Sequence, residues 1–102
     1  MNISSRYSDN PDVVIDEAKI PAPLRHLLPL AREWSIGDDL ELQAYIASTP
    51  PDQLRRFAEA FAPHYDALAA WHDELAHLVP QPDELVLFDI ATNAAATVEG
   101  ML

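Results

Sequence analysis

The longest regular pattern in this chain is a stripe of mostly apolar residues between positions 54 and 79. They recur at spacings of three and four, which is the repeat of one face of an α-helix. The stripe consists of Leu54, Phe57, Ala58, Phe61, Tyr65, Leu68, Ala69, His72, Leu75, Ala76 and Val79. Pro63 interrupts it, so we expect either one kinked helix or two helices at about 50–62 and 64–78. The stripe keeps its phase across the proline, which slightly favours the kinked helix.

Glycine is scarce, with only Gly37 and Gly100 among 102 residues. Hairpin-rich β folds need residues that accept positive φ at their turns, and glycine is the usual one. The length is that of one domain, and 49% of the residues are hydrophobic, which is enough for one folded core. We therefore predict an all-α fold, a compact bundle of four to five helices with a flexible N-terminal arm. Residues 1–20 form the predicted arm, and residues 21–102 form the predicted single helical domain.

The first expected helix follows a proline-rich segment. Inside a helix, Pro29 would remove a hydrogen bond and clash with the preceding turn. A short turn at 22–27, followed by a helix that begins near Leu28, avoids this clash by placing the proline at the first helical position. Gly37 would then end the helix in the left-handed conformation. Upstream, the apolar trio 13–15 could join the fold as an edge strand or lie on the core.

A second helix is expected over residues 39–48. Asp38 is its predicted N-cap, with Glu41 as the capping-box partner three residues later. This helix carries two apolar faces, so we expect it to be covered on two sides. The faces consist of Leu40, Ala44 and Ala47 on one side and of Leu42, Tyr45 and Ile46 on the other.

Two further helix starts are marked by caps. Thr49 is the predicted cap of the helix with the long stripe, with Pro50 at its first position. Asp83 is the predicted cap of a last helix from residue 84 to about residue 99. A strand at 85–88 is the alternative, but the alanine-rich continuation favours a helix. The expected inner face of this helix consists of Leu87, Ile90, Ala91, Ala94 and Val98.

The charge of the chain is strongly one-sided, with a formal net charge of −11. After Arg56 the chain carries no Lys or Arg at all. The carboxylates of this second part are Glu59, Asp66, Asp73, Glu74, Asp83, Glu84, Asp89 and Glu99. Phosphate backbones and anionic lipid surfaces would repel such a chain, so we expect no nucleic-acid partner and no membrane partner. A mimic of DNA would be an exception, since its target would be a DNA-binding protein. The expected partner is a basic protein.

Composition also indicates where the protein works. There is no cysteine, so neither a disulfide framework nor thiolate chemistry is expected. No apolar run reaches the roughly 18 residues of a membrane span, and residues 1–7 lack the pattern of a secretory signal. We therefore expect a soluble cytoplasmic protein. Arg outnumbers Lys and Ala is abundant, a bias that suits a GC-rich bacterial genome.

His72 and His77 are the first candidates for a metal site. Their spacing of five puts the two rings about 140° apart around a regular helix, so they cannot bind one ion together. Asp73 with His77 has the spacing of a ligand pair, and His64 could approach from the kink. The simpler interpretation is that His72 lies on the apolar stripe as a hydrogen-bonded, half-buried residue, with Asp73 and His77 a solvated helix pair. We expect no metal and no cofactor.

The remaining polar residues indicate no reaction. None of the serines lies in the glycine-flanked turn of a hydrolase nucleophile, and the two glycines are too far apart for a phosphate-binding loop. Asp38, Asp39 and Glu41 cluster at a helix start, where capping and the helix dipole favour acids without any further function. The sequence therefore predicts no enzyme and no catalytic residue.

The candidate partner-binding residues lie between positions 65 and 74, where Trp71 lies beside the long stripe among the acids. They are Trp71, Asp73, Glu74, Tyr65 and Asp66. An aromatic ring that is partly exposed among acids is what a binding hot spot for a basic protein would look like. The alternative for Trp71 is a place at the edge of the core, where it would cover a helix crossing. Trp34, which completes an apolar helix face, is expected in the core.

These observations give three hypotheses for function. The first is a small acidic protein-binding module, such as an immunity or antitoxin-like inhibitor of a basic toxin, or an adaptor. The second is a self-associating structural domain that completes its core in a homodimer, with the acidity serving solubility. The third is a metal-binding protein or enzyme built on His64, Asp73 and His77.

Overall fold

The computed structural model describes residues 6–102 of the chain, and the description below is confined to them. These residues form five α-helices, with three short 3₁₀ segments before the first helix and one between the third and the fourth, and no strand beyond one isolated bridge between Arg6 and Ile36. The predicted all-α bundle of four to five helices is therefore confirmed. The helices are α1 (Leu28–Glu33), α2 (Asp39–Ser48), α3 (Pro51–Phe61), α4 (Tyr65–Leu75) and α5 (Asp83–Met101).

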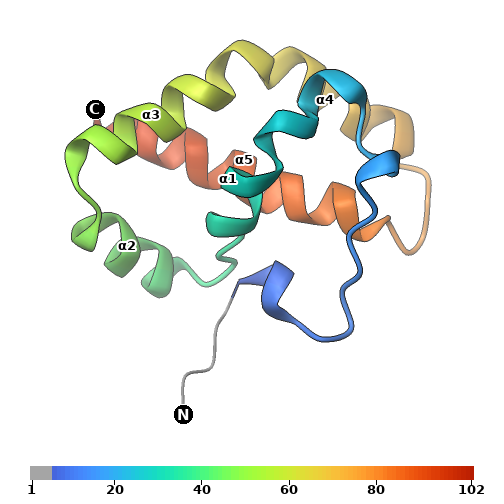
Figure 1. Ribbon diagram of the computed structural model, residues 1–102, viewed down its shortest axis with the longest axis horizontal. Helices are drawn as coiled ribbons and strands as arrows, with labels where there is room; N and C mark the ends of the chain where they lie inside the picture. Colours follow the sequence, from blue (N-terminus) through green and yellow to red (C-terminus); the bar gives the residue numbers. More distant parts are fainter. Residues whose placement is uncertain (1–5) are drawn as a thin grey trace.

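Helix α5 runs through the middle of the molecule (Figure 1), with α3 and α4 arching along one side and α1 crossing it. The molecule measures 36 × 35 × 20 Å, so its thin dimension is about two helix diameters. α5 is central because apolar residues cover much of its surface. Its buried apolar residues are Leu85, Leu87, Phe88, Ala91, Ala94, Ala95 and Val98. Most of the predicted inner face is confirmed, with Ile90 only partly buried.

Aromatic rings form the centre of the core beside α5. Trp34 follows the end of α1 and stacks on Phe57 of α3, with ring centroids 4.3 Å apart and planes 6° from parallel. Phe61 and Tyr45 meet these two rings edge-on. Trp34 is 1% exposed, so its predicted place in the core is confirmed. Such contacts add roughly 0.5–1.5 kcal/mol per ring pair to the apolar burial itself.

The proline-rich segment before α1 folds as predicted. A 3₁₀ turn spans Ala22–Leu27, and α1 begins at Leu28 with Pro29 in its first turn. The prediction for Gly37 is wrong, because no residue of the described chain, glycine included, has a positive φ. α1 instead ends at Glu33, with Trp34 in the capping position, and the chain then continues without helix to meet the N-terminal arm. There the amide of Tyr7 donates to the carbonyl oxygen of Ser35 at 2.8 Å.

Helix α2 has the predicted bounds and the predicted cap. The Asp38 carboxylate accepts a hydrogen bond from the amide of Glu41 at 2.9 Å. The expectation of two covered faces is wrong. Leu42 and Ile46 are buried, whereas Leu40 is 82% exposed. Ala44 and Ala47 on the same outer face are also exposed, so α2 packs along one side only.

Helix α3 begins one residue later than predicted, at Pro51, with Pro50 in the capping position. Thr49 does not cap α3, because its hydroxyl donates to the Tyr45 carbonyl oxygen at the end of α2, at 2.6 Å. At Pro63 the chain forms a 3₁₀ turn (Ala62–His64), and α4 begins after it. The slightly favoured kinked helix is therefore wrong. A proline cannot donate the helical hydrogen bond, and the tighter turn accommodates its ring.

Helix α5 begins at Asp83 itself, with Pro82 in the capping position and without a side-chain cap. The predicted capping role of Asp83 is wrong because the N-terminal arm uses its carboxylate. The Tyr7 hydroxyl donates to Asp83 at 2.8 Å, and the amide of Val14 donates to it at 3.3 Å. The neighbouring Glu84 accepts from the amide of Asp16 at 2.8 Å. The strand alternative at 85–88 is excluded, since these residues are helical.

The described part of the arm, residues 6–20, lies against the helices. Ile20 is fully buried, and Ile15 is partly buried against the core, while Val14 is 73% exposed. The trio 13–15 thus lies on the helices and forms no strand. Residues 1–5 of the predicted arm lie outside the described residues. The flexibility of the arm and the domain boundary at residue 20 stay predictions.

Candidate functional site

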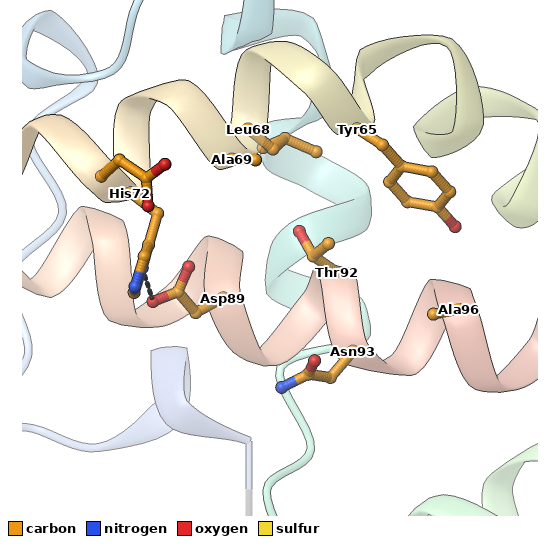
Figure 2. Close-up of a pocket in the computed structure, with 9 residues that line it drawn as sticks. Tyr65, Leu68, Ala69, His72, Asp89, Thr92, Asn93 and Ala96 are labelled. Atoms are coloured by element: carbon orange, nitrogen blue, oxygen red, sulfur yellow. Dashed lines mark hydrogen bonds and ion pairs between the residues drawn. The ribbon is translucent and has the colours of Figure 1, made fainter. Parts of the chain in front are cut away.

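A groove of about 470 Å³ runs between α4 and α5. It is lined by Tyr65, Leu68, Ala69, His72 and Asp73 of α4 and by Asp89, Thr92, Asn93 and Ala96 of α5. Figure 2 shows its side chains along the two helices, with His72 and Asp89 towards one end and Tyr65 towards the other. The volume lies in the range typical of ligand and recognition pockets.

The groove is open because the two helices present small residues there. Ala69 on α4 and Ala96 on α5 have no side chain long enough to fill the space between the helices. Leu68, which is 5% exposed, lies in the core cluster and also lines the groove. The three residues give the groove an apolar part, flanked by the polar side chains of both helices.

His72 and Asp89 join the two helices across one end of the groove. The ring nitrogen Nδ1 of His72 lies 2.8 Å from the carboxylate oxygen Oδ2 of Asp89. The side chains are 42% and 36% exposed, so water screens the pair, and we expect it to add less than about 1 kcal/mol to stability. This geometry matches the simpler interpretation of His72 as a hydrogen-bonded, half-buried residue.

Tyr65 bounds the opposite end of the groove. Its hydroxyl donates a hydrogen bond to Glu99 at 2.9 Å. Burial of the ring and this hydrogen bond to the carboxylate raise the pKa of Tyr65 from 10.0 to about 12. The phenol therefore keeps its proton at neutral pH, and that proton is directed to Glu99.

The structure separates the five predicted partner-binding residues. Tyr65 and Asp73 line the groove, whereas Asp66 and Glu74 are exposed on α4 and do not line it. Trp71 is only 6% exposed, and its ring meets Phe88 of α5 edge-on, with centroids 5.4 Å apart. Trp71 thus occupies the place at the edge of the core that the alternative interpretation expects.

Sequence reasoning missed Asp89 as a groove residue and as the partner of His72. The two residues are 17 positions apart on different helices, so no local spacing connects them. One signal was present, since Asp89 is the single charged residue between Leu85 and Ala91 in an apolar helix segment. A carboxylate in such a place needs a polar partner or an opening to solvent, and here it has both.

The candidate metal ligands are not brought together. Within residues 6–102, no group of three or more His, Cys, Asp or Glu side chains is placed to hold a metal ion. His72 is engaged with Asp89, and the ring of His64 meets that of His26 edge-on, with centroids 5.0 Å apart. His77 is exposed in the turn after α4.

None of the helices in the described part of the chain combines the length and the apolar character needed to cross a membrane. In comparisons with protein-family models, curated proteins and solved structures, none matches this chain.

Proposed function

We propose that this chain is a small acidic module that binds a basic partner protein, as an immunity protein, an antitoxin or an adaptor does. The observation that carries the proposal is the charge of α4 and α5. Three acids lie on α4 and four on α5, and neither helix carries a Lys or Arg. We propose the cytoplasm as the place where the partner is met.

The exposed acids of α4 support this proposal most directly. Asp66, Asp73 and Glu74 are exposed, and none of the hydrogen bonds within residues 6–102 uses their side chains. Their charge is thus available to attract a cationic protein over several ångströms before contact. Such a field mainly raises the association rate, and close contacts then determine how long the complex lasts.

Affinity capture from the native lysate, followed by a salt gradient, provides the candidate partner. The test is the association rate of that purified partner with a variant that carries Asp73→Lys and Glu74→Lys. We expect slower association and a weaker salt dependence, because the two reversals remove the attraction at this face. Both residues lie at the end of α4, where cations are favourable, so the helix should be retained. Unchanged rates would contradict the proposal.

A matched control reverses the same number of acids at another place on the molecule. Asp12→Lys with Asp52→Lys alters two exposed acids that belong to neither α4 nor α5 and that do not line the groove. If the α4–α5 face binds the partner, this control keeps most of the association rate at moderate salt, since distant charges are screened. Equal losses in both variants would indicate an effect of net charge alone.

A second candidate function, self-association, is favoured by the outer face of α2. Leu40 is 82% exposed there, beside the exposed Ala44 and Ala47. The two functions differ in the sign of their salt dependence. Two copies with a net charge of −11 repel each other, so salt should strengthen a homodimer and weaken a complex with a basic protein. Sedimentation of the wild type and of Leu40→Gln at low and high salt measures the oligomeric state and so distinguishes the two functions.

A further inference from the structure

We propose that the groove between α4 and α5 receives an arginine side chain of the basic partner. The aliphatic part of that side chain would lie on Leu68, Ala69 and Ala96, and its guanidinium would bind the carboxylates of Asp89 and Asp73. This inference rests on the proposed function and specifies the chemistry of the contact. It concerns a single anchor residue, whereas the proposed function concerns the charged face as a whole.

The lining of the groove matches an amphipathic cation. A long basic side chain buries its methylene groups on apolar surface and keeps its charged head at polar groups. The groove offers both, since Leu68 and the two alanines are apolar and both helices contribute a carboxylate. An apolar side chain would take water from Asp73 and from the Oδ1 atom of Asp89 without replacing its hydrogen bonds, and an anion would be repelled. The lining therefore selects a cationic occupant.

The hydroxyl groups of the groove act as acceptors. The hydrogen of Thr92 Oγ1 is directed to the carbonyl oxygen of Phe88 in its own helix, at 2.6 Å. The hydrogen of the Tyr65 hydroxyl is directed to Glu99. Both oxygens keep lone pairs for an incoming donor. The groove thus presents acceptors, which favours an occupant with many N–H donors.

The carboxylate of Asp89 is already oriented before such an occupant binds. Its Oδ2 atom is bound to His72, and its Oδ1 atom makes no hydrogen bond with any residue in the described range. The side chain is 36% exposed, so Oδ1 can be reached from outside. A carboxylate that is already oriented loses less conformational freedom when it binds. The planar guanidinium has five donors and can serve carboxylates from two helices, which the ammonium of lysine does less well.

The test is a titration of the ¹⁵N-labelled chain with Nα-acetyl-arginine amide, followed by NMR. Nα-acetyl-norleucine amide serves as the uncharged control, and Nα-acetyl-lysine amide serves as the point-charge control. We expect saturable shifts of the amides of Ala69, His72, Asp89 and Thr92 with the arginine probe. The lysine probe should bind more weakly, and the norleucine probe should cause no saturable shift. Equal shifts with all three probes would overturn the proposal.

Two variants separate the groove from the rest of the acidic face. Asp89→Asn should weaken binding of the arginine probe about tenfold, because a charge-assisted hydrogen bond is lost. Glu74→Gln removes the same charge from an exposed acid of α4 outside the groove, and it should leave probe binding unchanged. Equal weakening in both variants would overturn the proposal, since it would indicate a diffuse attraction.

A peptide experiment distinguishes a protein anchor from a free small cation. An alanine-rich acetylated peptide with one central arginine should shift the same amides as the arginine probe. Spermidine that saturates these amides at lower concentration than the peptide would overturn the proposal in favour of a small polycation site. If no probe enters the groove but the captured partner still loses association rate with the Asp73→Lys and Glu74→Lys variant, only the groove proposal fails. If neither effect is seen, both fail.

Discussion

The first turn of α5 and the middle of α5 use their carboxylates in opposite ways. Asp83 and Glu84 hold the N-terminal arm, through the hydroxyl of Tyr7 and the amides of Val14 and Asp16. Asp89, less than two turns later, faces the groove and is bound only by His72 among the described residues. Glu84 is 2% exposed, whereas the side chain of Asp89 is 36% exposed.

The difference shows that a count of acids does not identify the acids that a partner can reach. Glu84 is buried without a cation, and a backbone amide satisfies it, as burial of a polar group requires. Asp83, at the start of the same helix, likewise accepts hydrogen bonds from the arm. These two acids hold the N-terminal arm on α5, whereas the acids on α4 and at the groove are open to solvent. The four predictions below test this division along α5, from the largest expected effect to the smallest.

Phe88→Ala shows how much stability is lost when a core residue directly beside Asp89 is truncated. Phe88 is 1% exposed and packs edge-on against Trp71. Its removal should lower the free energy of unfolding by about 3–5 kcal/mol, because apolar contacts are lost and a cavity remains. Urea unfolding followed by tryptophan fluorescence measures this. A loss below that of the Glu84 variant described next would contradict the assignment of Trp71 and Phe88 to the core.

Glu84→Ala should lower the free energy of unfolding by about 1–3 kcal/mol, because the amide of Asp16 is left without its acceptor. Glu84→Gln keeps a side-chain oxygen and is the matched control, with a smaller expected loss. Hydrogen exchange at the amide of Asp16 should become faster in the alanine variant alone. Unchanged exchange there would show that the arm does not depend on Glu84.

Tyr7→Phe should cost about 1 kcal/mol through loss of the hydrogen bond to Asp83. The same contact makes stability depend on alkaline pH. Burial, followed by the hydrogen bond to Asp83 and its charge, raises the pKa of Tyr7 from 10.0 to about 12. A raised pKa means that the folded state holds the proton more tightly, so its stabilising effect is complete below pH 10 and is lost between about 10 and 12.

The pKa of Tyr65 is also raised to about 12, so Tyr65 contributes to the same loss of stability at alkaline pH. The measurement is the free energy of unfolding at several pH values in this window, for the wild type, Tyr7→Phe and Tyr65→Phe. Each variant should lose less stability than the wild type as the pH rises. An equally steep loss in all three would contradict the assigned hydrogen bonds.

Asp89→Asn should change the free energy of unfolding by less than about 1 kcal/mol, because the pair with His72 is exposed. This is the smallest stability effect of the series, although the same variant should lose most binding of the arginine probe. Thermal unfolding of the variant beside the wild type measures it. A loss of stability as large as that of Glu84→Ala would contradict the difference between the first turn and the middle of α5.

Local interactions made much of the fold predictable. The start of α1 at Leu28 follows from the geometry of Pro29, and the start of α2 follows from the Asp38 carboxylate and an amide three residues away. The all-α class follows from the periodicity of the apolar residues and the scarcity of glycine. The excess of negative charge in the second half needs no structure at all, since it is a property of composition.

The tertiary structure decided which residues are available. Trp71 is buried by Phe88 of another helix, and Asp83 serves the arm in place of the helix end. The groove depends on the packing of α4 against α5, which also brings His72 and Asp89 together. The hydrogen bonds concerned join residues 17, 68, 69 and 76 positions apart. Local spacing carries no information about such pairs, because they form only when the packing of the helices brings distant segments together. The Asp38 cap and the periodicity of the apolar residues depend on neighbours within one or two turns, so the sequence alone determined those.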